Sequence, residues 1–152
     1  MGEFSVLIGG KAGFGIDKAS LIIANLIGRL GYRIYIYRDY PSLIRGGHTF
    51  SIIRASTEKV AAHRDKIDAL LALNQETVDI HKDRLKSDGI LIYDSDLVSS
   101  APSTGAKNVA GLPLSTIVKE ENAEEVMRNT CIIGAFAKSI GIEWNILDAV
   151  FK

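Results

Sequence analysis

The chain has 152 residues, of which 47% are hydrophobic and 24% charged, with 18 basic and 18 acidic side chains. These values are typical of one soluble globular domain that is large enough to bury a real core. The balanced charge argues against a general nucleic-acid or membrane-surface binder. The apolar runs are too short for a membrane span or a signal peptide. One cysteine, Cys131, can form neither an intramolecular disulfide nor a four-thiolate metal site, which favours the reducing cytoplasm.

The first part of the chain predicts a strand, a loop, a helix and a second strand. Residues 3–9 are an apolar run that ends in glycine, and GGKAGFG at 9–15 is typical of a tight loop. Residues 17–30 predict a helix that is apolar around most of its circumference, with Gly31 as its stop. The sequence YRIYIYR at 32–38 predicts the second strand. This order is a βαβ unit, so we expect the two strands to form a parallel pair with a right-handed crossover.

The rest of the chain continues to alternate between strands and helices. Further strands are expected at 48–56, 68–74, 89–95 and 109–115, the last of them at a sheet edge because of Pro113. Helices are expected at 75–86 and 122–142, the second with Asn122 as N-cap and Gly141 as stop. The predicted fold is therefore an α/β three-layer sandwich, with a Rossmann-like, mostly parallel sheet and helices on both faces.

Residues 142–152, IEWNILDAVFK, begin a helical pattern that halts without a cap or a polar tail. This ending favours a single domain, 1–152, that forms the N-terminal part of a longer polypeptide. The alternative is a natural end in a helix.

The loop at 9–15 follows a strand and opens a helix, which is where α/β folds bind phosphates. The dinucleotide fingerprint GxGxxG is not met, and no Gly-Lys-Ser/Thr closes the run. Asp39 stands at the end of the second strand, where a ribose-binding acid would sit, so an NAD-type site is one hypothesis. The glycines Gly10, Gly13 and Gly15 fit either an anion-binding loop or a tight turn alone.

The stretch YPSLIRGGH at 40–48 combines several donors for an anion. Arg45 offers a planar fork of N–H groups, and Gly46 and Gly47 can expose successive backbone N–H groups. His48 adds a donor that can charge near neutral pH. We expect this loop and the loop at 9–15 to share one sheet edge and form a binding cleft. The alternative is a solvated turn.

The remaining polar residues give weaker predictions of a functional site than the two glycine-rich loops. The turn Met127–Thr130 interrupts an apolar helix and either faces a loop or partner or is simply exposed. His63 and His81 look structural or solvated, and the carboxylates of Asp94 and Asp96 have no basic neighbour in sequence. No complete catalytic constellation is present, so the sequence favours a binding module over a self-sufficient enzyme.

These motifs resemble the γ subunit or γ domain of 2-oxoacid:ferredoxin oxidoreductases, the pyruvate and 2-oxoglutarate synthase group. YPSLIRGG at 40–47 resembles that family's Tyr-Pro-Ser-x-x-Arg-Gly-Gly loop, and residues 10–15 its Gly-x-Gly-Gly-Gln-Gly loop. DALLAL at 68–73 and the set Asn129, Gly134 and Ala135 match two further landmarks. The chain is most like the N-terminal γ domain of a fused 2-oxoglutarate-type α subunit. Ala12 and Phe14 replace a family Gly and the family Gln, which weakens a polar role for that loop and implies a divergent substrate or a partly lost function.

The resemblance implies an enzyme of several subunits that oxidatively decarboxylates a 2-oxoacid to an acyl-CoA and passes electrons to ferredoxin. Thiamine diphosphate and iron–sulfur clusters would be held by the partner subunits, α, β and in some members δ, and none by this chain alone. This chain would help to bind coenzyme A and dock its partners, with contacts to a second copy also expected. A purely structural docking domain is the alternative. The expected coenzyme A-side residues are Gly10, Gly13, Gly15, Arg45, Gly46, Gly47, His48 and Asn129.

Overall fold

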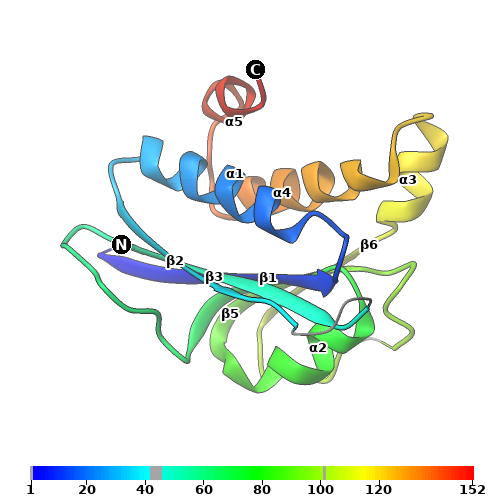
Figure 1. Cartoon of the computed structure of the whole chain (residues 1–152), viewed down its shortest axis with the longest axis horizontal. Helices are drawn as coiled ribbons and strands as arrows, with labels where there is room; N and C mark the ends of the chain where they lie inside the picture. Colours follow the sequence, from blue (N-terminus) through cyan, green and yellow to red (C-terminus); the bar gives the residue numbers. More distant parts are fainter. Residues whose placement is uncertain (1, 42–45, 101) are drawn as a thin grey trace.

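A computed structural model describes residues 2–41, 46–100 and 102–152 of the chain (Figure 1). The strands are β1 (Glu3–Lys11), β2 (Arg33–Asp39), β3 (His48–Ser56), β4 (Ile67–Ala72), β5 (Leu85–Asp94) and β6 (Asn108–Leu112). The α-helices are α1 (Ile16–Arg29), α2 (Gln75–His81), α3 (Leu114–Glu120), α4 (Arg128–Ser139) and α5 (Trp144–Phe151). Two short 3₁₀ turns, Lys82–Arg84 and Glu125–Met127, follow α2 and precede α4. No described helix is long and apolar enough to cross a bilayer.

The six strands form one mixed sheet in the order β2-β3-β1-β4-β5-β6. β1, β4, β5 and β6 are parallel neighbours, whereas β3 is antiparallel to both β1 and β2. The expected direct pairing of the first two strands is therefore wrong, because β3 lies between them. β2 ends at Asp39 and β3 begins at His48 at the same edge of the sheet, so β3 runs back antiparallel to β2. The mostly parallel α/β sheet is confirmed, with β3 as its one reversed strand.

Helices cover both faces of the sheet, as expected (Figure 1). On one face, α1 and α4 pack on apolar side chains of the central strands, and α5 packs against α1. On the other face α2 lies below the sheet and contributes Val78 to a smaller cluster with Leu7, Ile52, Leu70 and Leu91. The side chains of β1 alternate between the two clusters, because successive residues of a strand point to opposite faces.

Several predicted boundaries need correction. β1 continues through Gly9 and Gly10 to Lys11, so only residues 12–15 form the loop. The last predicted strand ends at Leu112, and Pro113 begins the unpredicted helix α3. Asn122 is not an N-cap: it has a left-handed φ of 52° in the turn after α3.

Both predicted helix stops are confirmed. Gly31 and Gly141 follow α1 and α4 with φ of 91° and 76°, the left-handed conformation that a Cβ disfavours.

Two glycines of the α4 region should respond oppositely to alanine. Gly141→Ala should lower the free energy of unfolding by about 1–2 kcal/mol, the cost of a left-handed L-residue. Gly134, inside α4, has open space where a Cβ would stand. Gly134→Ala should therefore raise the free energy of unfolding by up to about 1 kcal/mol through helix propensity. Urea unfolding of both variants measures the pair; equal shifts of one sign would contradict the assignment.

Candidate functional site

The two glycine-rich loops meet at one edge of the sheet, as the sequence predicts. The N–H of Ala12 donates to the carbonyl of Gly47 at 2.9 Å. Lys11 and His48 are direct cross-strand partners at the end of the β1–β3 ladder. The carboxyl ends of the parallel strands β4, β5 and β6 also lie at this edge. Ligands of open α/β sheets commonly bind at this edge.

Positive φ angles explain most of the glycines in these loops. Gly13, Gly15, Gly46 and Gly47 have φ of 95°, 75°, 72° and 90°. Other residues are strained there, so the backbone conformation requires glycine. Arg45 lies outside the described residues, and its position is left to the sequence-based prediction.

Gly10 differs from the other predicted site glycines. It is buried within β1, where an added Cβ would come within 3.0 Å of the Phe14 ring. The absence of a side chain at Gly10 therefore allows Phe14 to pack against β1, and in this way Gly10 supports the loop.

Asn129, at the start of α4, holds the first loop in place. Its amide Nδ2 donates to the carbonyl of Phe14 at 2.7 Å and lies 3.4 Å from that of Gly15. A Cβ on Gly15 would lie 3.0 Å from this nitrogen, so the contact also favours glycine. The turn Met127–Thr130 thus faces a loop, one of the two outcomes that its polar interruption predicts.

Phe14 covers a buried charge cluster that sequence reasoning missed. The guanidinium carbon of Arg128 lies 4.5 Å from the Phe14 ring centroid, a cation–π contact. Arg128 Nη1 lies 3.7 Å from Oδ2 of Asp94, and both residues are buried. Burial raises the pKa of Asp94, although the N–H groups of Asp96 and Leu114 donate to its carboxylate. The basic partner of Asp94 is therefore far away in sequence, on α4.

A second missed cluster surrounds His48 on the α2 face of the sheet. Nε2 of His48 lies 2.8 Å from Nε2 of His81, and the rings of both contact Phe50. His81 is 1% exposed, so of the two alternatives, structural or solvated, the structural one holds for this histidine. Burial lowers the pKa of His81 to about 3, aided by nearby His48 and Arg84, and burial also lowers the pKa of His48. Both rings are therefore neutral near pH 7.

The hydrogen-bond partners assign the tautomers of this pair. Nη1 of Arg84 lies 3.3 Å from Nδ1 of His81, and a guanidinium can only donate, so this Nδ1 accepts. The His81 proton is then on Nε2, which donates to Nε2 of His48. His48 must carry its own proton on Nδ1. That atom is buried and has no hydrogen-bond partner among the described residues.

Lys11 adds a positive charge beside His48. Its side chain is exposed, and it shares the α2 face of the sheet with His48. Within the described part of the chain, no acidic side chain forms an ion pair with Lys11. The amine of Lys11 is therefore available to an acceptor or anion at the joined loops, whereas the Nδ1–H of His48 is unpartnered but buried. A positive residue within the glycine run was the signal that could have identified Lys11.

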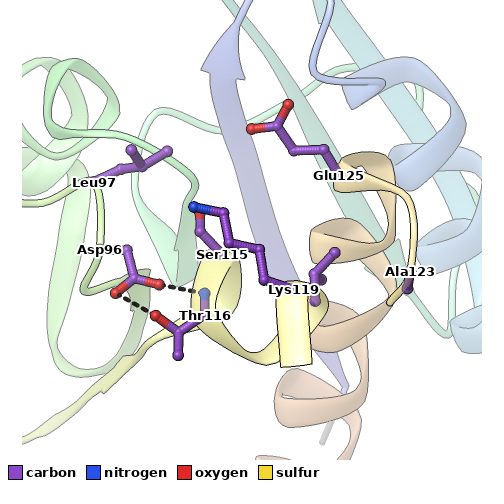
Figure 2. A pocket seen from close by; sticks show the side chains of 8 residues that line it. Asp96, Leu97, Ser115, Thr116, Lys119, Ala123 and Glu125 are labelled. Atoms are coloured by element: carbon purple, nitrogen blue, oxygen red, sulfur yellow. Dashed lines mark hydrogen bonds between the residues drawn. The ribbon is translucent and has the colours of Figure 1, made fainter. Parts of the chain in front are cut away.

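A pocket of about 570 Å³ opens beside α3, further along the same sheet edge (Figure 2). It is lined by Asp96, Leu97, Ser115, Thr116, Val118, Lys119, Ala123 and Glu125. The carboxylate of Asp96 accepts hydrogen bonds from the N–H and hydroxyl of Thr116, as Figure 2 shows. With two carboxylates and one amine, this pocket is a poorer anion site than the joined loops.

Other residues singled out in the sequence lie apart from the joined loops or serve the fold. His63 stacks on Tyr37 with ring centroids 4.2 Å apart. The Asp39 carboxylate accepts from the hydroxyl of Tyr37, and β3 separates its strand from β1, so a dinucleotide site across adjacent strands is not formed. Cys131 is half-buried, and burial raises the pKa of its thiol.

Comparison with known proteins agrees with the resemblance. The γ subunit of a keto/oxoacid ferredoxin oxidoreductase from Geobacter sulfurreducens has a similar structure, with a TM-score of 0.85, 27% identity and coverage of 99% of this chain and 84% of that one. A 2-oxoglutarate:ferredoxin oxidoreductase from Magnetococcus marinus, solved with 2-oxoglutarate, coenzyme A and succinyl-CoA bound, gives a TM-score of 0.84 at 28% identity, covering 99% of this chain and 26% of that one.

A curated relative is the α subunit of a 2-oxoacid:ferredoxin oxidoreductase from a Sulfolobus species. It is 41% identical over 92 residues, which are 60% of this chain and 14% of that subunit. The chain thus spans a small part of this relative's length. Residues 5–152 match the family described as pyruvate ferredoxin/flavodoxin oxidoreductase. Because that match covers nearly the whole chain, the protein belongs to the pyruvate ferredoxin/flavodoxin oxidoreductase family.

Proposed function

We propose that this chain is the γ component of a 2-oxoacid:ferredoxin oxidoreductase, in which it receives coenzyme A and docks partner subunits. The observation that carries the proposal is the junction of the two glycine loops through Ala12 and Gly47, with Lys11 and His48 beside it. The enzyme would oxidatively decarboxylate a 2-oxoacid to an acyl-CoA in the cytoplasm and pass the electrons to ferredoxin. Relatives named as subunits of such enzymes support this assignment.

The chemistry of coenzyme A fits the groups at this edge. Its phosphates are anions, which suit the exposed amine of Lys11, the guanidinium predicted at Arg45 and the N–H groups of a glycine loop. Its pantetheine arm carries amide carbonyls, which suit the backbone N–H groups of the glycine loops. The Nδ1–H of His48 is buried and would have to be uncovered before it could donate to this arm. Asn129 and Arg128 would act indirectly, by fixing the loop at Phe14 and Gly15.

The residues of this chain do not fit the other cofactors of such enzymes. Within the described ranges, no group of three or more His, Cys, Asp or Glu side chains could hold a metal ion, and the full sequence has one cysteine. We therefore assign thiamine diphosphate and the iron–sulfur clusters to partner subunits, α, β and in some assemblies δ.

Calorimetric titration of the assembled complex tests the ligand assignment. Coenzyme A should give a saturable heat of binding, whereas NAD should give none, because Asp39 is not next to the β1 loop. A saturable heat with NAD alone would support the nucleotide-binding alternative. No heat of binding with either ligand would favour the alternative that this chain is a purely structural docking domain.

Arg45→Ala should raise the apparent KM for coenzyme A by roughly ten- to a hundredfold, the loss expected for a hydrogen bond to a charged group. Decarboxylation of the 2-oxoacid in the absence of coenzyme A should persist. Arg64→Ala is the matched control, since Arg64 pairs with Glu3 at the opposite sheet edge. An unchanged KM in Arg45→Ala would show that Arg45 serves the fold or a partner instead.

The assignment of Nδ1 of His81 as an acceptor requires a neutral His81, which stability can test. The folded chain protonates His81 only near a pKa of about 3, against an ordinary value of 6.5. The unfolded chain therefore binds more protons between these values, and the free energy of unfolding falls as the pH decreases through this window. The slope from His81 should be about 1.4 kcal/mol per pH unit.

Urea unfolding at several pH values from about 6.5 downward measures this slope, since a free histidine is half charged at about 6.5 and more so below it. His81→Gln keeps hydrogen-bonding capacity but does not titrate, so its profile should be flatter than that of the wild type. Parallel profiles would mean that His81 is not held neutral by the fold.

A further inference from the structure

β2 is the outermost strand on one side of the sheet and has the features of a pairing edge. It pairs with β3 in unbroken register from Arg33 to Asp39, without bulge or proline. Among the residues that the structure describes, nothing pairs with its outer side. An open, regular edge presents unpaired N–H and C=O groups, which readily accept another strand.

The sequence of this strand, RIYIYRD, is complementary to itself when read antiparallel about Ile36. Arg33 then faces Asp39 at both ends, and Tyr35 faces Tyr37. From this complementarity we propose that two copies of the chain pair through β2 about a two-fold axis at Ile36, joining their sheets into one. The partner is a second copy because the strand supplies both members of each charge pair.

The charges select one register. A two-fold axis perpendicular to the sheet keeps each side chain on its own face, so only shifts of two residues are allowed. A shift in either direction leaves Arg33 or Asp39 without a cross-strand partner. Within the described residues neither side chain is used in an ion pair, whereas Arg38 lies 3.7 Å from Asp17. Arg33 is therefore available to the second copy, and Asp39, whose Oδ2 accepts from the hydroxyl of Tyr37, keeps its Oδ1 for the same contact.

An apolar groove on the helix face supports the same contact. This groove, of about 660 Å³, runs beside β2 and includes Leu21, Ile34, Ile36 and Val150 in its lining. Leu21 is 46% exposed, which is high for a leucine on a helix that faces the sheet. The two-fold axis would bring the two grooves next to each other, so pairing would cover part of their apolar lining, while Asn25 and Arg29 give each groove a polar rim.

This pairing is independent of the proposed ligand site. The two β2 strands run in opposite directions, so the loops after Asp39 lie at opposite ends of the joint. Each Ala12–Gly47 junction lies between β1 and β3, on the side of β3 that faces away from β2. Failure of coenzyme A binding would not affect the dimer, and failure of the dimer would not affect the ligand assignment.

Sedimentation velocity of the 152-residue chain over a range of micromolar concentrations should show a dimer. Arg33→Asp and Asp39→Arg each place like charges across both ends of the joint, and each should raise the dimer dissociation constant about tenfold or more. The double variant Arg33→Asp/Asp39→Arg restores opposite charges and should return the constant to near the wild-type value. Lys107→Asp, next to the other edge strand β6, is the matched control and should leave the dimer intact.

Circular dichroism and urea midpoints establish that each variant is folded. A wild-type chain that is monomeric at every concentration overturns the proposal and leaves the edge to a strand of another subunit. A dimer that the single charge reversals leave unchanged, or that the double variant fails to restore, also overturns it, because another surface would then hold the copies together.

Discussion

The antiparallel insertion of β3 between β1 and β2 is the constraint on which the rest of the molecule depends. Because β3 begins at the edge where β1 ends, its first residue, His48, is the cross-strand partner of Lys11. The bond from Ala12 N–H to the Gly47 carbonyl then extends the ladder by one step beyond the strands. A parallel β1–β2 pair would leave residues 46–48 one strand further from the first loop. The cleft is thus a product of strand order, and its glycines are the residues that can make the required turns.

Phe14 determines which groups can act as donors at this edge. Its ring lies between the strand at Gly10 and the guanidinium of Arg128, so the loop is fixed by packing and by the amide of Asn129. A phenyl ring offers no conventional hydrogen bond, so the accessible donors at the junction are backbone N–H groups and the amine of Lys11. The buried Asp94 carboxylate offsets the charge of Arg128, which would otherwise be costly under an aromatic cover. An apolar residue at this position is therefore compatible with a binding loop whose donors lie elsewhere.

The sequence predicted what depends on local pattern. Apolar periodicity located most strands and helices, and Gly31 and Gly141 marked real helix ends because left-handed φ is a local requirement. The shared edge of the two loops followed from strand direction alone. The neighbours of β2, the Asp94–Arg128 contact and the His48–His81 pair depend on residues distant in the chain. Their charges and rings are ordinary in the one-dimensional sequence, and only the strand order brings them together.

One signal for the strand order was nevertheless present in the second strand itself. A central strand of such a sheet is buried on both faces and is normally a continuous aliphatic run, as VLI is in β1. β2 instead carries tyrosines and arginines, and no residue of it is fully buried, whereas seven of the nine residues of β1 are. Such a composition suits a sheet edge, where phenol and guanidinium groups can reach water. The burial of the two strands agrees with this placement, since six of the nine residues of β3 are buried and none of β2 is.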